Sequence, residues 1–210
     1  NGVILPSIID EDMVLTKDNL YIIPNATVIN TGVTVRVEAG TNIQFWSDDP
    51  KDPYAETYIA YLLVNGNFLV EGTKEEPVHI YPSQLMSQFG VEIGSSDSGY
   101  VSLKYADITN FFYADDHTGQ GNYINLADHC TFRFNYSTDL GYRDLSAGRV
   151  GSYVINGYPP PIIGSMKAKD CVFYKIGYYY YSTPIPVSLG GSTDRCIFVD
   201  CGIHLPDTNK

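Results

Sequence analysis

The sequence predicts an all-β fold, a single-stranded right-handed parallel β-helix in which short strands stack into a coil. Apolar and polar residues alternate along much of the chain, and glycine or asparagine interrupts the alternation. The alternating runs are only about three to five residues long, too short to fill a broad flat sheet. A third observation is a repeat near the length of one coil turn. Together these favour strands that each pair with the equivalent strand one turn later.

The alternation is clearest in the first 80 residues. Valines at every second position of 32–40 define one face, and the residues between them are polar or charged. We expect turns at Gly40 and Gly66, because glycine adopts turn conformations without steric cost. The inward positions are predicted to be Val33, Val35, Val37, Ile43, Phe45, Leu62, Val64, Phe68, Val70, Val78 and Ile80.

Four later segments share one pattern: two polar residues, a small residue, any residue and a large apolar residue. They are 104–108, 128–132, 169–173 and 194–198. The small position holds Ala106, Cys130, Cys171 and Cys196 in turn. The spacing is 24 residues from 106 to 130, 41 from 130 to 171 and 25 from 171 to 196. Two spacings fit one turn of a coil, and the third fits a turn that carries an insertion.

The domain organisation follows from this alignment. We expect one β-helix domain over 1–210, with an N-terminal cap and entry strand at 1–27 and a loop insertion rich in tyrosine and proline at 136–164. The last turn, near 196–203, shows no cap. We therefore expect a continuing chain, a cap from elsewhere or a partner at that end.

The cysteines fit the small-residue column. Buried free thiols are the first interpretation, and a disulfide between Cys171 and Cys196 is the alternative, because adjacent strands lie within disulfide reach. Cys201 is expected on the following strand. The chain has no CxxC pair, so zinc and redox motifs have no support.

Charge and hydropathy narrow the classes of molecule that the chain is expected to bind. The chain has 24 acidic and 13 Lys or Arg residues, a formal charge of -11. An acidic chain has little attraction for nucleic acid or anionic lipid. No apolar stretch approaches the roughly 20 residues of a membrane span, so we expect no membrane insertion by this segment.

Two polar clusters are weak candidates for chemistry. Asp115, Asp116 and His117 combine two carboxylates with an imidazole, which suits acid-base work, although adjacent residues on a strand point to opposite faces. Asp48 and Asp49, with Asp52, offer oxygen ligands that suit calcium. A solvated turn and a polar loop are the simpler interpretations. We assign no catalytic residue and no cofactor, with calcium as the open alternative.

Tyrosine is the stronger functional signal, at 18 residues. Its ring offers a flat apolar face and a hydroxyl, which suits contact with a sugar ring or a protein. Loops that project from a rigid coil are the usual place for such contacts. The alternative is that these rings cover the coil. The candidate ligand-binding residues are Tyr142, Tyr153, Tyr158, Tyr178 and Tyr180.

Residues 28–45 and 62–80 resemble a recurrent pattern of bacterial secreted and cell-surface parallel β-helix proteins, the pectate-lyase-like solenoids. The match includes Gly32, Gly40, Gly66 and the run Gly72-Thr73, with a polar insertion from Ser47 to Tyr61 between the halves. The resemblance implies the right-handed coil. It also implies an extracellular or cell-surface location, with a lipid anchor through a removed leader as one route.

The resemblance implies no single activity, because such modules occur in enzymes, adhesins and lipoproteins. Three hypotheses remain. The first is a non-catalytic module that binds glycan or a protein partner through tyrosine-rich loops. The second is a polysaccharide lyase or glycoside hydrolase, or a fragment of one, although the Asn-Thr-Asp, Gly-His-Gly and Arg-x-Lys elements of pectin hydrolases are missing. The third is an architectural spacer of a larger surface protein.

Overall fold

The structure is a computed structural model. It describes residues 2–47, 58–84, 89–110, 124–133, 166–174, 178–180, 183–185, 187–188, 192–199 and 203–204. Within these ranges every regular element is a β-strand, which confirms the all-β prediction. In the same ranges no helix is long and apolar enough to cross a membrane.

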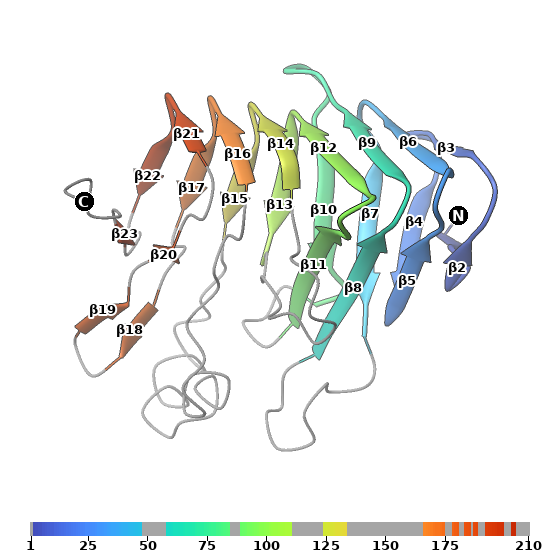
Figure 1. The fold of residues 1–210 in the computed structure, drawn as a ribbon, viewed down its shortest axis with the longest axis horizontal. Coiled ribbons are helices and arrows are strands. Elements are labelled where there is room, and N and C mark those ends of the chain that lie inside the picture. The colour runs from blue at the N-terminus through green and yellow to red at the C-terminus, as the bar shows by residue number, and fades with distance from the viewer. Residues whose placement is uncertain are drawn as a thin grey trace.

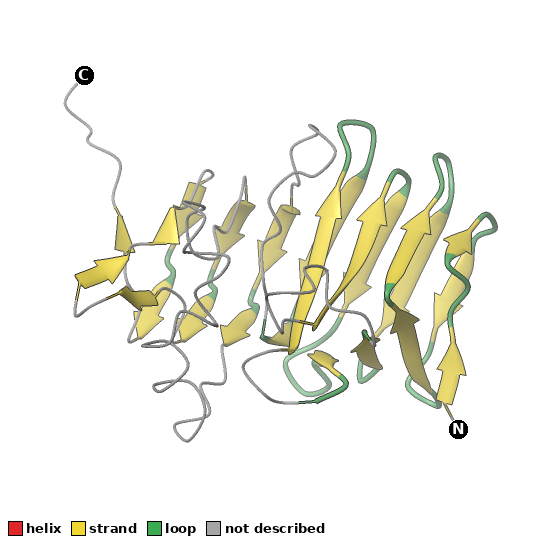
Figure 2. Cartoon of the chain, turned by 90° about the horizontal axis from the view of Figure 1, so that it is seen from below, coloured by secondary structure: helices red, strands yellow, loops and turns green. Residues whose placement is uncertain are grey.

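Most of the strands form three parallel sheets that wind together as a coil (Figure 1). Two further pairs, antiparallel β18 (Tyr178–Tyr180) with β19 (Thr183–Ile185) and parallel β20 (Val187–Ser188) with β23 (Ile203–His204), form separate two-stranded sheets. As far as β12 (Tyr100–Lys104), the chain passes from sheet A to sheet B to sheet C and back to sheet A, and from β13 (Ala106–Thr109) onward no described strand belongs to sheet B. Sheet A has eight strands, sheet B four and sheet C seven among the described residues. Seen from below, the strands lie side by side along the long axis (Figure 2). The predicted solenoid is confirmed at this level.

The strand bounds place each residue in its sheet. Sheet A contains β1 (Gly2–Ile4), β4 (Leu20–Pro24), β7 (Asn42–Trp46), β10 (Val78–Pro82), β13 (Ala106–Thr109), β15 (Thr131–Arg133), β17 (Val172–Tyr174) and β22 (Ile197–Val199). Sheet B contains β2 (Ile8–Ile9), β5 (Ala26–Ile29), β8 (Tyr58–Val64) and β11 (Phe89–Ser95). Sheet C contains β3 (Met13–Leu15), β6 (Thr34–Glu38), β9 (Asn67–Glu71), β12 (Tyr100–Lys104), β14 (Ile124–Asp128), β16 (Met166–Lys169) and β21 (Ser192–Asp194).

The core is a continuous column of inward side chains from all three sheets. Every inward position that the alternation predicts between 33 and 80 is buried. In sheet A the column ends in three phenylalanines from successive turns, Phe132, Phe173 and Phe198. Their ring centroids are 5.2 and 4.9 Å apart, and the rings are nearly parallel. Inward-facing residues on one strand pair with inward-facing residues on the neighbouring strands. Each turn therefore extends the apolar column of the preceding turn.

The pairing register confirms the later repeat. Asp107 pairs with Thr131, Thr131 with Val172, and Val172 with Ile197. These are the residues that directly follow Ala106, Cys130, Cys171 and Cys196. The 41-residue spacing is therefore still one turn, because β15 and β17 are neighbours.

Some details differ from the sequence expectation. Residues 58–61 were expected in the insertion before Leu62, but they begin strand β8. Strands β8 and β11 have seven residues each, longer than predicted. Seven in-register pairs join them, and this pairing accounts for the extra length. Residues 2–27 contain β1, β2 and β3, which are the first strands of the three sheets.

The connections between sheets differ in length. In the later turns, one or two residues connect a sheet C strand to the following sheet A strand. These connections are 105, 129–130, 170–171 and 195–196. The four internal segments of four or more residues that lie outside the described ranges all follow a sheet A strand instead, and so does 175–177, whereas 181–182, 186 and 189–191 follow strands of other sheets. Segments 48–57, 85–88, 111–123, 134–165 and 175–177 follow β7, β10, β13, β15 and β17 respectively. The long connections therefore all begin at the ends of sheet A strands.

Candidate functional site

The tight corner from sheet C to sheet A carries one residue per turn with a positive φ. These residues are Tyr105, His129, Asp170 and Arg195, with φ between 45° and 54°. Only glycine, and less often asparagine or aspartate, adopts this conformation readily. The corner repeats at four successive turns, so the four side chains follow one another along the coil. We call this set the corner ladder.

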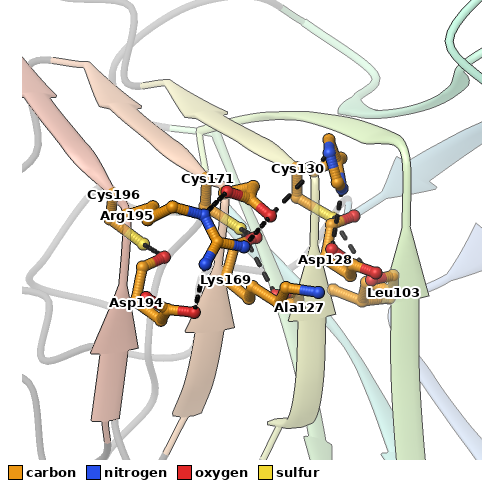
Figure 3. Close-up of polar contacts among 11 residues, drawn as sticks. Leu103, Ala127, Asp128, Cys130, Lys169, Cys171, Asp194, Arg195 and Cys196 are labelled. Carbon is orange, nitrogen blue, oxygen red and sulfur yellow. Dashed lines mark hydrogen bonds and ion pairs between the residues drawn. The ribbon is translucent and has the colours of Figure 1, made fainter.

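Each member of the corner ladder contacts the next. The rings of Tyr105 and His129 stack with centroids 4.6 Å apart. His129 Nε2 lies 3.9 Å from Asp170 Oδ2. Arg195 donates two hydrogen bonds to the two oxygens of Asp170, at 2.6 and 2.7 Å (Figure 3). These contacts offset the backbone cost of the corner, because each ordered side chain gains a partner on the adjacent turn.

A second column runs beside the ladder and alternates in charge. Lys104 pairs in register with Asp128, Asp128 with Lys169, and Lys169 with Asp194. Opposite charges on adjacent strands attract, and each such pair contributes modestly when exposed. The fork of Arg195 lowers the pKa of the Asp170 carboxyl, and Asp170 in turn raises the pKa of Arg195.

One group in this region has the residue types of a metal site. Ligand atoms of Asp128, His129 and Asp170 all lie within 4.8 Å of one another. However, Asp128 Oδ1 accepts a hydrogen bond from His129 Nδ1 at 2.7 Å, and Arg195 holds both oxygens of Asp170. A cation would have to displace the guanidinium. The arrangement therefore fits an ion-paired corner better than an open cation site.

The cysteine column lies on the inner side of the same corner. Cys130 and Cys171 are buried, Cys196 is half-buried, and all three are free thiols. Each thiol donates to a backbone carbonyl, for example Cys171 Sγ to Lys169 O at 3.2 Å (Figure 3). Burial raises the pKa of Cys130 well above its ordinary value and also raises that of Cys196. The interpretation as buried free thiols is confirmed for Cys130 and Cys171, whereas Cys196 is free but only half-buried. The Cys171–Cys196 disulfide is absent, and Cys201 lies outside the described residues.

The outer face of sheet A carries a second polar group, His79, Asp107 and Arg133. Arg133 donates a 2.6 Å hydrogen bond to Asp107 Oδ2, and His79 Nδ1 lies 3.7 Å from the same oxygen. Asp107 Oδ1 and Arg133 Nε are buried without a hydrogen-bond partner among the described residues. An unmet buried polar atom costs on the order of 1–3 kcal/mol. Stability alone therefore does not account for this trio.

The candidates from sequence lie mostly outside the described residues. This holds for Asp48, Asp49, Asp52, Asp115, Asp116, His117, Tyr142, Tyr153 and Tyr158. Tyr178 and Tyr180 belong to β18 (Tyr178–Tyr180), which pairs antiparallel with β19 (Thr183–Ile185). All of these residues share one property, since each belongs to a connection that leaves sheet A. The origins of these connections therefore all lie at the ends of sheet A strands.

Sequence reasoning missed Trp46 and the His79–Asp107–Arg133 trio. Trp46 is the last residue of β7 and is 49% exposed, directly before the connection 48–57. The alternation places Trp46, His79 and Asp107 on the outer face, so the signal was present. What the sequence alone could not show is that their strands are neighbours in one sheet.

Comparison with family models, with curated proteins and with solved structures finds no match for this chain.

Proposed function

We propose that this chain is a non-catalytic glycan-binding module of the extracellular space or cell surface, built on a right-handed coil. The right hand rests on the general rule that parallel strands in one sheet are joined by right-handed crossovers. The location rests on the resemblance of residues 28–45 and 62–80 to secreted and surface solenoids. The coil serves as a rigid scaffold, and the connections that leave sheet A serve as the binding side.

One observation carries the proposal: every candidate segment from the sequence follows a sheet A strand. The segments after β7, β13 and β15 hold the aspartate, histidine and tyrosine candidates, and the hairpin β18–β19 follows β17. Solenoids use projecting segments on one side for recognition, while the coil fixes where they begin. Tyrosine is the residue type on these segments that suits a sugar ring or a protein surface.

A glycan array probed with the full chain tests the proposal. We expect retention on a group of related glycans, weakened at least about tenfold by combined Tyr142→Ala, Tyr153→Ala and Tyr158→Ala substitutions. Tyr100→Ala is the matched control, because Tyr100 is 41% exposed but lies on sheet C. An array without any retained glycan would contradict the proposal and favour an architectural spacer. Binding of the chain to a protein partner, without binding to any glycan, would favour a protein-docking module.

A polysaccharide-cleaving enzyme is the second candidate function, and the His79–Asp107–Arg133 trio is the observation that favours it. An imidazole, a carboxylate and a guanidinium within contact of one another are common in sites that move protons. Incubation with pectins and uronic-acid polymers, monitored for unsaturated products or new reducing ends, tests this candidate. Product formation that His79→Gln abolishes would replace the binding proposal, and unchanged polymers would reject the enzyme.

A further inference from the structure

The outer face of sheet A has a polar band between two apolar ends. The band covers β7, β10, β13 and β15, whose register aligns its outward residues in two rows along the coil. One row is Asn42, His79, Asp107 and Thr131, and the other is Gln44, Tyr81, Thr109 and Arg133. On either side of the band the same rows hold apolar residues, Leu20 and Ile22 on β4 and Val172 on β17. The amide, hydroxyl and imidazole groups are thus concentrated in the middle of the face.

The band is close to neutral within a strongly acidic chain. Its formal charges are Asp107 and Arg133, which pair with each other at 2.6 Å. The whole chain carries -11. Because no free positive charge faces outward from the band, an acidic polymer would gain nothing there and would be repelled by the rest of the chain. A neutral ligand that accepts and donates hydrogen bonds fits this face best.

Exposed aromatic rings flank the band. Trp46 stands at the edge of β7, and Tyr174 on β17 is 39% exposed. Four strand steps separate β7 from β17, a span of about 19 Å at about 4.8 Å per step. Tyr81, on β10, lies between them. Flat rings at both ends of a hydrogen-bonding band suit an extended molecule with alternating apolar and hydroxyl faces.

The spacing of the strands is similar to the repeat of an extended polysaccharide. Polar groups recur on this face at every strand, about 4.8 Å apart along the axis. One sugar unit of an extended β-linked polysaccharide has a similar rise. A polymer that lies along the axis would therefore meet equivalent groups at each turn.

We propose that the outer face of sheet A, from Trp46 to Tyr174, binds a neutral β-linked polysaccharide that lies along the coil axis. The Trp46 and Tyr174 rings stack on sugar rings, and the two polar rows hydrogen-bond the hydroxyl groups. This inference rests on the proposed function and names the ligand class and the face of the coil that holds it. It assigns to sheet A itself a binding role that the sequence pattern indicates only for the connections.

Isothermal titration calorimetry with β-1,4-linked hexasaccharides of glucose, mannose and xylose tests the inference. Wild-type protein should bind at least one of them and bind polygalacturonic acid at least about tenfold more weakly. Trp46→Ala and Tyr174→Ala should each weaken binding about tenfold, as truncation of an aromatic anchor does. Trp46→Phe should retain most of the affinity, because it keeps an aromatic plane. Tyr100→Ala serves as the control on sheet C, and thermal unfolding checks that each variant is folded.

The outcomes separate the inference from the proposed function. If wild type binds a neutral hexasaccharide and both alanine variants bind as Tyr100→Ala does, the sheet A face is wrong and the connections remain the binding side. Preference for polygalacturonic acid would overturn the neutral ligand class while leaving a glycan-binding module. Absence of binding to every glycan on the array would overturn the proposed function, and this inference with it.

Discussion

At the scale of single residues, the corners are the least expected feature. Within the described part of the chain, six non-glycine residues have positive φ, namely Asn25, Tyr105, Asn110, His129, Asp170 and Arg195. A left-handed conformation costs an ordinary residue about 1–2 kcal/mol. Four of these residues form the corner ladder, where a ring stack and ion pairs link the turns. We infer that each corner side chain stabilises the neighbouring turn and so offsets its own backbone cost.

The Asp170–Arg195 pair predicts a pH dependence of stability. The folded-state pKa of Asp170 is lowered, so its contribution is present above the ordinary carboxyl pKa of about 3.9 and is lost as the pH falls through the folded value. Arg195→Gln should therefore lower the urea midpoint at pH 7, and its difference from wild type should close below about pH 4. Lys167→Gln, which removes a positive charge elsewhere on sheet C, is the control. A difference that stays constant down to pH 2.5 would contradict the assignment.

At the scale of elements, close stacking of turns makes some positions intolerant. A Cβ atom on Gly66 would collide with the backbone oxygens of Val33 and Asn30 on the preceding turn. A Cβ atom on Gly32 would meet nothing within 4 Å, although its φ is +82°. The two positions thus favour glycine for different reasons. Gly66 has no room for a side chain, and Gly32 has a left-handed backbone conformation.

This difference gives a paired prediction for the turns. Gly66→Ala should destabilise the protein by about 3 kcal/mol or more, because backbone atoms of the adjacent turn cannot move aside. Gly32→Asn should cost less than about 1 kcal/mol, since asparagine tolerates the left-handed conformation. Urea unfolding followed by circular dichroism measures both. Equal losses would show that the turns are not packed as closely as the structure has them.

The phenylalanine stack gives a second prediction at this scale. Phe173 lies between Phe132 and Phe198 and is fully buried. Phe173→Ala should cost about 3–5 kcal/mol of unfolding free energy through lost burial and a cavity. Phe198→Ala should cost less, because Phe198 is only partly buried. If chemical denaturation showed a larger loss of unfolding free energy for Phe198→Ala than for Phe173→Ala, the stack would not be part of the core as described.

The elements were largely predictable from sequence, and the site was not. Strict alternation identified the inward apolar residues between Val33 and Ile80, because a half-buried strand has a period of two. The small-residue column fixed the register of the later turns, since only a constant side-chain size allows such stacking. By contrast, nothing local links His79 to Arg133, 54 positions apart, or indicates that His129 occupies a strained corner. Such contacts depend on which strands become neighbours.

At the scale of the molecule, the coil separates two tasks. Its corner from sheet C to sheet A is tight, and a ring stack followed by ion pairs links the later turns. Its long connections begin at the ends of sheet A strands. A scaffold with one closed corner and with its long connections all starting from one sheet suits the recognition of a long ligand, because every turn can contribute a contact. We propose that this ligand is a neutral glycan held on the outer face of sheet A.

Tryptophan fluorescence reports whether a bound glycan lies on the outer face of sheet A, because Trp46 is the chain's single tryptophan and lies on that face. Titration with the neutral hexasaccharide that binds most tightly should shift the emission to shorter wavelength and saturate at the calorimetric affinity, as a sugar ring displaces water from the indole. Emission that stays unchanged while calorimetry records binding would contradict the account, because the glycan would then lie elsewhere on the molecule.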